Sequence, residues 1–161
     1  MKDTMPISEQ QYLSTTYRPD CDYVDGEVRE RNLGEYEHSN LQTGLAVWLG
    51  NNERDWNIRV LIAQRIRVAP CRYRVADICV LDRNQPIEPV FTQPPLICIE
   101  VLSKDDNLRE MQERVTDYSN LCVPNVWIVD PQSRRAYAGS VLEAQGTSIR
   151  IPLDGVFAEL D

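Results

Sequence analysis

Apolar residues recur along this chain with two different spacings, and each spacing predicts one kind of element. Spacings of three and four residues predict helices at about 37–49 and about 105–121. Alternation or a short apolar run predicts strands, and four such stretches occur, at 59–68, 73–81, 96–102 and 125–130. The pattern is therefore typical of a β-sheet combined with helices.

Turn and capping residues complete this outline at both ends of the chain. Ser8 and Gln11 form a capping-box pair, which predicts a short first helix that ends near Ser14. Asp25-Gly26 between apolar flanks predicts a hairpin, and Arg135–Leu142 with Ser148–Ile151 predicts another. The element order predicts a mixed α/β (α+β) sheet with a helix on each face, and no repeat or second domain interrupts residues 1–161.

Composition and charge exclude several classes of protein and of functional site. No run approaches the roughly 18 apolar residues of a membrane helix, and the N-terminus lacks the apolar core of a signal peptide. We therefore expect a soluble, cytoplasmic protein without a membrane partner. The five cysteines include no CxxC pair, and the single histidine excludes any site that needs two imidazoles. The net charge of −8 argues against non-specific nucleic-acid binding over the whole surface, yet it permits a local basic groove or an acidic site that works through a cation.

Two predicted strands that are otherwise apolar each contain an acid. Asp77 occurs in VADICVL, and Glu100 occurs in LICIEVLS. An unpaired carboxylate inside a sheet costs several kcal/mol, of order, so each one needs compensation if it is buried. A buried arginine could pair with one acid, the two acids could share a proton, or a divalent cation could bridge both. The pattern also permits the acids to lie on a solvated face, and it leaves these alternatives open.

Several motifs in a fixed order resemble one known family. They are YVDGEV, His38 at the start of a helix, VADICVL, LICIEVLS, and an arginine and a tyrosine before VPNVWIVDP. This set is similar to the Uma-type restriction-endonuclease-like family, once described as a domain of unknown function, within the PD-(D/E)xK nuclease superfamily. The resemblance runs from about Ile7 to Tyr137. It implies a restriction-endonuclease-like mixed sheet flanked by helices, with additional N- and C-terminal hairpins in a single domain.

The resemblance also implies roles for individual residues. Asp77 and Glu100 match the two acids that bind Mg²⁺ or Mn²⁺, with the Val101 carbonyl as a third ligand. His38 matches a histidine that could contact a substrate phosphate or orient a water. Asp22 lies where the family tends to carry a glutamate, and Gln64, the one polar residue on the apolar face of its strand, could line the same pocket.

The chain departs from the family pattern at two positions. Ala76 replaces the proline before Asp77, and Arg114, four residues before Tyr118, replaces the motif lysine. Arginine stays protonated and cannot act as a base, although it can hold a phosphate. Arg114 flanks the apolar stripe of its helix, where it could reach over the sheet or remain a surface residue, and Lys104 could supply the missing amine.

Two functions follow from the resemblance and its departures. The first is a metal-dependent endonuclease that hydrolyses phosphodiester bonds in nucleic acid, with DNA expected, and whose activity Arg114 weakens. The second is a non-catalytic homodimer of the same fold that binds DNA or protein. Homodimerisation is expected through apolar residues on the last hairpin, namely Tyr137, Val141, Ile149 and Ile151.

Overall fold

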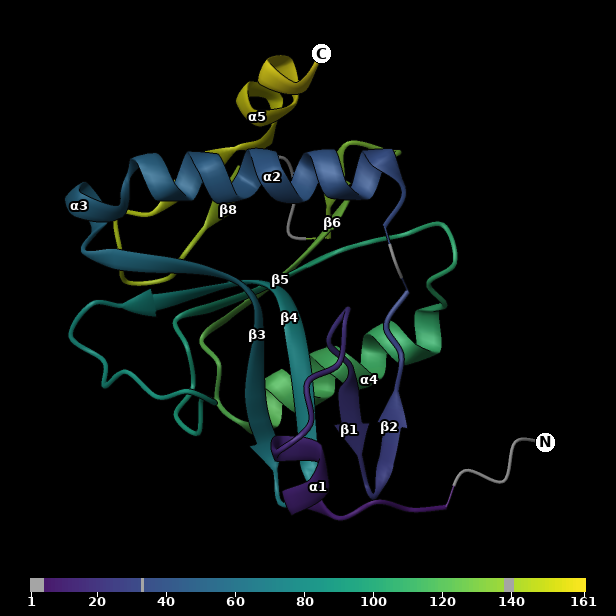
Figure 1. Cartoon of the computed structure of the whole chain (residues 1–161). Coiled ribbons are helices and arrows are strands. Elements are labelled where there is room, and N and C mark those ends of the chain that lie inside the picture. The colour runs from purple at the N-terminus through teal and green to yellow at the C-terminus, as the bar shows by residue number, and fades with distance from the viewer. Residues whose placement is uncertain (1–4, 33, 138–140) are drawn as a thin grey trace.

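A mixed β-sheet with helices on both faces forms the framework of the computed structural model, which describes residues 5–32, 34–137 and 141–161 (Figure 1). Within these residues, the main sheet runs in the order β2-β1-β4-β5-β6-β7, and β3 pairs with the other edge of β4. Its strands are β1 (Asp22–Val24), β2 (Glu27–Arg29), β3 (Ile58–Ala69), β4 (Arg72–Asp82), β5 (Ile97–Val101), β6 (Asn125–Asp130) and β7 (Arg135–Ala136).

The long strand β4 is shared between two parts of the sheet. One edge of β4 pairs with β3 over nearly its whole length, whereas the other edge is divided. At its start, Arg72 and Tyr73 pair with β1, and from Ile78 to Val80 it pairs with β5. The segment between these pairings, residues 74–77, faces a gap between β1 and β5. Asp77 lies in this gap.

Helices cover the two faces of the sheet. The helix α2 (Tyr36–Asn51) lies on one face with α5 (Leu153–Leu160), and α4 (Leu108–Asn120) lies on the other (Figure 1). Leu41, Leu45 and Leu49 of α2 join the larger core, and Tyr118 of α4 joins the smaller one. The described residues contain no helix that is long and apolar enough to cross a membrane.

The N-terminal predictions are confirmed. In α1 (Glu9–Leu13), Ser8 caps the backbone N–H of Gln11, whose side chain returns the hydrogen bond. Asp25 and Gly26 both have positive φ, 51° and 92°, as the tight turn between β1 and β2 requires. The helix α2 ends at Asn51, close to its predicted end, and a separate short helix, α3 (Glu53–Trp56), follows Asn52.

The start of α4 lies later than predicted. The helix begins at Leu108 because Asn107 is its N-cap and accepts a hydrogen bond from the Glu110 N–H. Asp106 is used in a turn before the helix, where its carboxylate accepts from the Ser103 N–H at 2.8 Å. Acidic residues that resemble a first helical turn therefore belong to the connection.

The predicted C-terminal hairpin is wrong in its first arm. Strand β7 pairs with β6 and extends the main sheet, while β8 (Val141–Glu143) pairs with β9 (Arg150–Pro152) in a separate ribbon. Ile149 and Ile151 are almost fully buried in the larger core, where α5 also packs. They are therefore not available for self-association, and of the expected apolar edge only Tyr137 is largely exposed.

Candidate active site

Asp77 lies where β4 separates from β5. Its neighbour Ile78 is the first residue of β4 paired with β5, opposite Ile99, so Asp77 precedes the pairing on β4 and Glu100 follows it on β5 at the opposite position. The Asp77 carboxylate fills the gap, and its Oδ2 accepts a hydrogen bond from the Val101 N–H at 2.8 Å. Asp77 and Glu100 therefore lie at paired positions of neighbouring strands. The convergence of their oxygens on one cation stays a prediction.

The two acids differ in how the protein stabilises their charge. Burial would raise the pKa of Asp77, but contact with His38, the Val101 N–H and the charge of Arg31 together hold this pKa below its ordinary value. Burial raises the pKa of Glu100 to about 8, and nearby Asp77 adds to the rise, against the opposing effects of Arg114 and Tyr118. Glu100 is therefore the acid that burial keeps protonated near neutral pH when no cation is bound.

Arg114 connects Glu100 to a third buried acid, Asp22. Its Nη1 donates to Glu100 Oε1 at 3.2 Å, and its Nη2 donates to Asp22 Oδ2. Tyr118, one turn later on α4, donates its hydroxyl to the same Glu100 oxygen at 2.6 Å. Arg114 thus reaches over the sheet from the edge of the apolar stripe, and its guanidinium lies between two acids.

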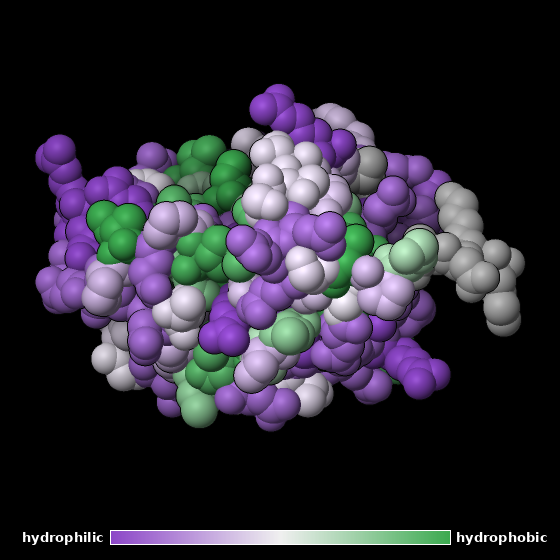
Figure 2. All heavy atoms as spheres, turned by 60° about the horizontal axis from the view of Figure 1, so that its bottom comes forward, coloured by the Kyte–Doolittle hydropathy of each residue, from purple (hydrophilic) through white to green (hydrophobic). Residues whose placement is uncertain are grey.

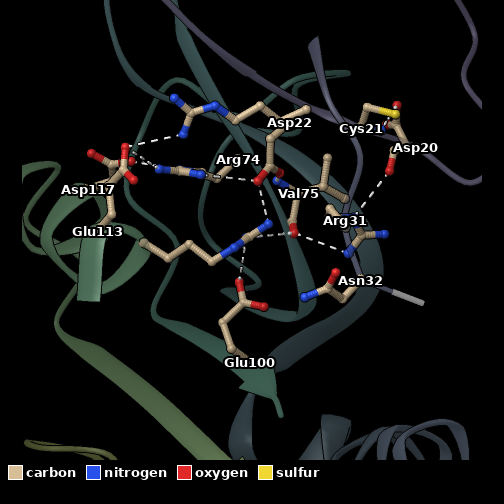
Figure 3. Close-up of polar contacts among 12 residues, drawn as sticks. Asp20, Cys21, Asp22, Arg31, Asn32, Arg74, Val75, Glu100, Glu113 and Asp117 are labelled. Atoms are coloured by element: carbon tan, nitrogen blue, oxygen red, sulfur yellow. Dashed lines mark hydrogen bonds and ion pairs between the residues drawn. The ribbon is translucent and has the colours of Figure 1, made fainter. Parts of the chain in front are cut away.

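A network of buried charges extends from Asp22 toward α4. Asp22 accepts hydrogen bonds from the Val75 N–H at 2.8 Å and from Arg74 Nη1 at 3.2 Å. Arg74 also donates to Asp117 at 2.7 Å, and one of its nitrogens is buried without a hydrogen bond, although Glu113 lies 3.4 Å away. Figure 3 shows these side chains directed toward one another between β4 and α4.

On the α2 side, three further residues surround Asp77. His38 Nε2 lies 3.4 Å from Asp77 Oδ2, and Arg31 Nη1 donates to Asp77 Oδ1 at 3.2 Å. Gln42 donates to the Asp77 backbone carbonyl at 2.9 Å. The position of His38 requires a glycine at residue 34, since a Cβ there would lie 2.1 Å from the His38 ring.

Most of these residues line one cleft of about 780 Å³ between β1, β2, α2 and α4. The cleft is open to solvent, and Asp77, Glu100, Val101, Arg114 and His38 all contribute to its wall. Among the described residues, more acids than arginines line it. The acids are Asp22, Glu27, Glu30, Asp77, Glu100, Asp106, Glu110 and Glu113, and the arginines are Arg29, Arg31, Arg74, Arg109 and Arg114.

Comparison with known protein families shows which family the chain belongs to. The family model described as "Uma2: Putative restriction endonuclease" matches residues 9–151, which include all of these site residues. The chain belongs to the Uma2 family. A search of curated proteins finds no match.

A solved structure has the same fold as this Uma2 chain. It is described as the crystal structure of "a putative nuclease belonging to DUF820 from Anabaena variabilis ATCC 29413". The comparison covers 97% of this chain and 100% of the other, with 17% sequence identity and a TM-score of 0.77. This likeness confirms the predicted nuclease-like α/β fold.

Two predicted site residues of this Uma2 chain lie outside the cleft. Lys104 is half exposed and pairs with Glu35 at 2.6 Å in a smaller neighbouring pocket, away from Asp77 and Glu100. Gln64 donates to the backbone carbonyls of Arg65 and Pro89, so its amide is satisfied within the loop region beside β3. Neither residue has a contact that would bring it to the carboxylates.

The sequence interpretation missed several residues that contact the buried acids through their side chains or backbone. Arg74 could have been found because, like Glu100, it is a charge in a strand rich in apolar residues and needs a counter-charge. Arg31 and Gln42 could not have been found in this way. Arg31 lies in a polar connection, and Gln42 lies on the helix α2, where a glutamine is an ordinary residue.

The donor set fits a hard divalent cation that keeps part of its water. Among the residues that the structure describes, no group of three or more His, Cys, Asp or Glu side chains could enclose a metal. Asp77 and Glu100 supply two carboxylates beside an open cleft, and Glu100 Oε2 accepts no hydrogen bond from the described chain. Mg²⁺ and Mn²⁺ suit such a site because they accept oxygen ligands, and Mg²⁺ usually retains several waters.

Proposed function

We propose that this Uma2 chain is a Mg²⁺- or Mn²⁺-dependent endonuclease that hydrolyses phosphodiester bonds in nucleic acid, with DNA as the expected substrate. One observation carries the proposal. Asp77 and Glu100, at opposite positions of β4 and β5, line a single solvent-open cleft in a chain whose family is described as "Putative restriction endonuclease". The nuclease fold of the solved relative supports the same assignment.

In this proposal, Asp77 and Glu100 hold the ion, and the Val101 backbone completes the protein side of the site. A bound divalent ion would lower the pKa of a water and polarise a phosphoryl oxygen. The carboxylate of Glu100 is fixed by Tyr118 and Arg114, so that its second oxygen faces the cleft. His38 lies on the other side of Asp77, where it can contact a phosphate or a water.

Arg114 contributes position and charge rather than proton transfer. Its pKa is raised above the ordinary arginine value despite burial, because Glu100 and Asp22 favour the charged form. A guanidinium in that state cannot accept a proton from a water, whereas it can stabilise negative charge on a phosphate. We therefore expect slow cleavage, because the chain uses arginine where its family pattern has lysine.

The proposal is tested by replacing the acid at the end of the β4–β5 pairing. Asp77→Asn keeps the shape of the side chain but removes its charge, so Mn²⁺-dependent cleavage of plasmid and single-stranded DNA should be lost. Asp82→Asn, the same change at the far end of β4, should leave the cleavage rate within about twofold. Equal rates for wild type and Asp77→Asn would contradict the proposed function.

The alternative function is a non-catalytic module that binds DNA or protein as a homodimer. The arginine contacts of both acids favour it, because Arg31 lies 3.2 Å from Asp77 and Arg114 lies 3.2 Å from Glu100, so positive charge is present beside each acid without a cation. Calorimetric titration separates the two functions. Absence of a Mn²⁺ binding signal, together with a stable dimer in light scattering, would favour the module.

A further inference from the structure

The two oxygens of Asp77 have different partners. Oδ2 is held by the protein framework, since it accepts the Val101 N–H at 2.8 Å and lies 3.4 Å from His38. Oδ1 is occupied by a single side chain, Arg31, whose Nη1 donates to it at 3.2 Å. A cation approaching Asp77 from the cleft therefore meets the oxygen that Arg31 already holds.

Glu100 is arranged differently. Its Oε1 accepts from both Tyr118 and Arg114, at 2.6 and 3.2 Å, whereas its Oε2 accepts no hydrogen bond from the described residues. Arg114 can therefore keep its contact with Glu100 while a cation uses the second oxygen. Such a separation is absent at Asp77, where Arg31 and a cation would contact one oxygen and repel each other at short range.

We propose that Arg31 competes with the divalent cation for Asp77, and that it binds a substrate phosphate once the cation has displaced it. This inference rests on the proposed function. The guanidinium of Arg31 supplies the positive charge beside Asp77 when no ion is bound. The ion takes over that role, and Arg31 becomes a substrate-binding residue.

The anchoring of Arg31 supports the second half of this inference. Its Nε donates to the Asp20 carbonyl at 3.2 Å, and its Nη1 also reaches the Val75 carbonyl at 3.3 Å (Figure 3). Nη2 makes no hydrogen bond with the described residues, and the side chain lines the cleft while it is 14% exposed. Loss of the Asp77 contact would leave a forked donor tethered at its base, and such a fork binds phosphate oxygens in pairs.

A purely structural role for Arg31 predicts a different result. If Arg31 only fixed the Asp77 side chain, its removal would disorder a metal ligand and weaken cation binding. Competition predicts the reverse, because the variant frees Asp77 Oδ1 and removes a positive charge from the site. The direction of the change in metal affinity therefore separates the two roles.

The first experiment measures Mn²⁺ binding by calorimetry for wild type, Arg31→Gln and Arg109→Gln. Arg109 is the matched control, since it is exposed and lines the same cleft from α4. We expect Arg31→Gln to bind Mn²⁺ about tenfold more tightly and Arg109→Gln to change binding by less than about twofold. Unchanged or weaker binding in Arg31→Gln would overturn the competition.

The second experiment measures oligonucleotide binding by fluorescence anisotropy with saturating Ca²⁺, which fills the site. We expect Arg31→Gln to bind about tenfold more weakly than wild type, and Arg31→Lys to lie between them, because lysine keeps the charge without the fork. Equal oligonucleotide affinities for all three proteins would overturn the phosphate contact. A melting temperature in EDTA close to wild type for Arg31→Lys ensures that one variant reports on a folded site.

The outcomes also separate this inference from the proposed function. Mn²⁺ binding with the same affinity in wild type and Arg31→Gln would leave the endonuclease proposal standing and would reject the role of Arg31. Absence of Mn²⁺ binding in wild type and in every variant would reject both.

Discussion

At the scale of single residues, the site combines buried acids with arginines that contact them. Four buried acids and three arginines lie between β1, β4, β5 and α4. The acids are Asp22, Asp77, Glu100 and Asp117, and the arginines are Arg31, Arg74 and Arg114. Hydrophobic residues of similar volume would often stabilise a fold as well as buried ion pairs do, so stability alone does not account for this arrangement. The proposed function would account for it, because a site for a cation and a phosphate needs both acids and arginines.

Glu100→Gln is expected to stabilise the metal-free protein as the pH rises. The folded-state pKa of about 8 lies above the ordinary 4.5, so the stability that protonated Glu100 contributes is fully present below pH 4.5 and is lost as pH rises toward 8. Glutamine is never ionised and avoids this loss. In EDTA, the variant should gain at least about 1 kcal/mol in free energy of unfolding at pH 8.5, and much less at pH 5.

Denaturant unfolding across this pH range measures the effect, with Glu110→Gln on the exposed side of α4 as control. If the difference in free energy of unfolding between Glu100→Gln and wild type stays constant from pH 5 to pH 8.5, burial does not shift the pKa of the Glu100 carboxyl.

Asp22→Asn should be strongly destabilising. Asp22 is 2% exposed, and loss of its charge leaves Arg74 and Arg114 without their shared partner. Breaking a buried pair in this way costs about 3–5 kcal/mol in free energy of unfolding. Asp25→Asn on the same hairpin is the matched control, because Asp25 is 72% exposed and pairs with Arg72 at the surface, where about 0–1 kcal/mol is expected. Urea unfolding of the two variants gives the comparison, and similar losses for both would contradict the importance of burial.

The acids could be predicted at this scale, and most of their partners could not. Asp77 and Glu100 interrupt apolar strands, so the sequence itself shows that they need compensation. The structure contains an arginine beside each acid together with a raised pKa at Glu100, and the metal site stays a prediction. Arg31 follows β2 in a polar connection, and no local pattern relates it to a residue of β4 that is 46 positions away.

The elements themselves were largely predictable, because periodicity and capping are local. The strands β3 to β6 and the helices α2 and α4 lie close to their predicted bounds. The C-terminal region was not predictable, because β7 pairs with β6 through tertiary contacts that the local sequence of β7 does not reveal. The helix α5 does carry apolar residues at helical spacing, but Gly155 lowers its helix propensity.

The helix α5 approaches α2 closely at a glycine. A Cβ at Gly44 would lie 2.8 Å from the Leu160 side chain, whereas nothing lies within 4 Å of a Cβ at Gly50 of the same helix. Gly44→Val should therefore push α5 away and cost about 1–3 kcal/mol in free energy of unfolding. Gly50→Val should change it by no more than about 0.5 kcal/mol, since a better helix former enters open space.

Thermal unfolding measures these stabilities, and limited proteolysis reports on α5. Cleavage within 153–160 should accelerate in Gly44→Val alone. Equal stability and equal proteolysis for the two valine variants would show that α5 does not depend on the close approach at Gly44.

At the scale of the whole molecule, charge and surface composition limit the partners. Hydrophilic residues predominate on the face in Figure 2, and hydrophobic residues lie there in separate patches. With Ile149 and Ile151 buried, the hairpin that was expected to support a homodimer no longer provides the reason for one. Homodimerisation stays a prediction that rests on other surfaces.

We expect the proposed nucleic-acid binding to require divalent cations, because the net charge is −8 and the cleft is lined by more acids than arginines. A phosphate backbone approaching this cleft without a cation meets more acids than arginines, so attraction is weak or absent.

Oligonucleotide binding should therefore be undetectable in EDTA at physiological salt and should appear with Ca²⁺, with fluorescence anisotropy as the measurement. Asp77→Asn should abolish the gain from Ca²⁺, whereas Asp82→Asn should preserve it. Binding of equal strength in EDTA and in Ca²⁺ would contradict the cation requirement and would favour a non-catalytic module that holds DNA through surfaces outside the cleft.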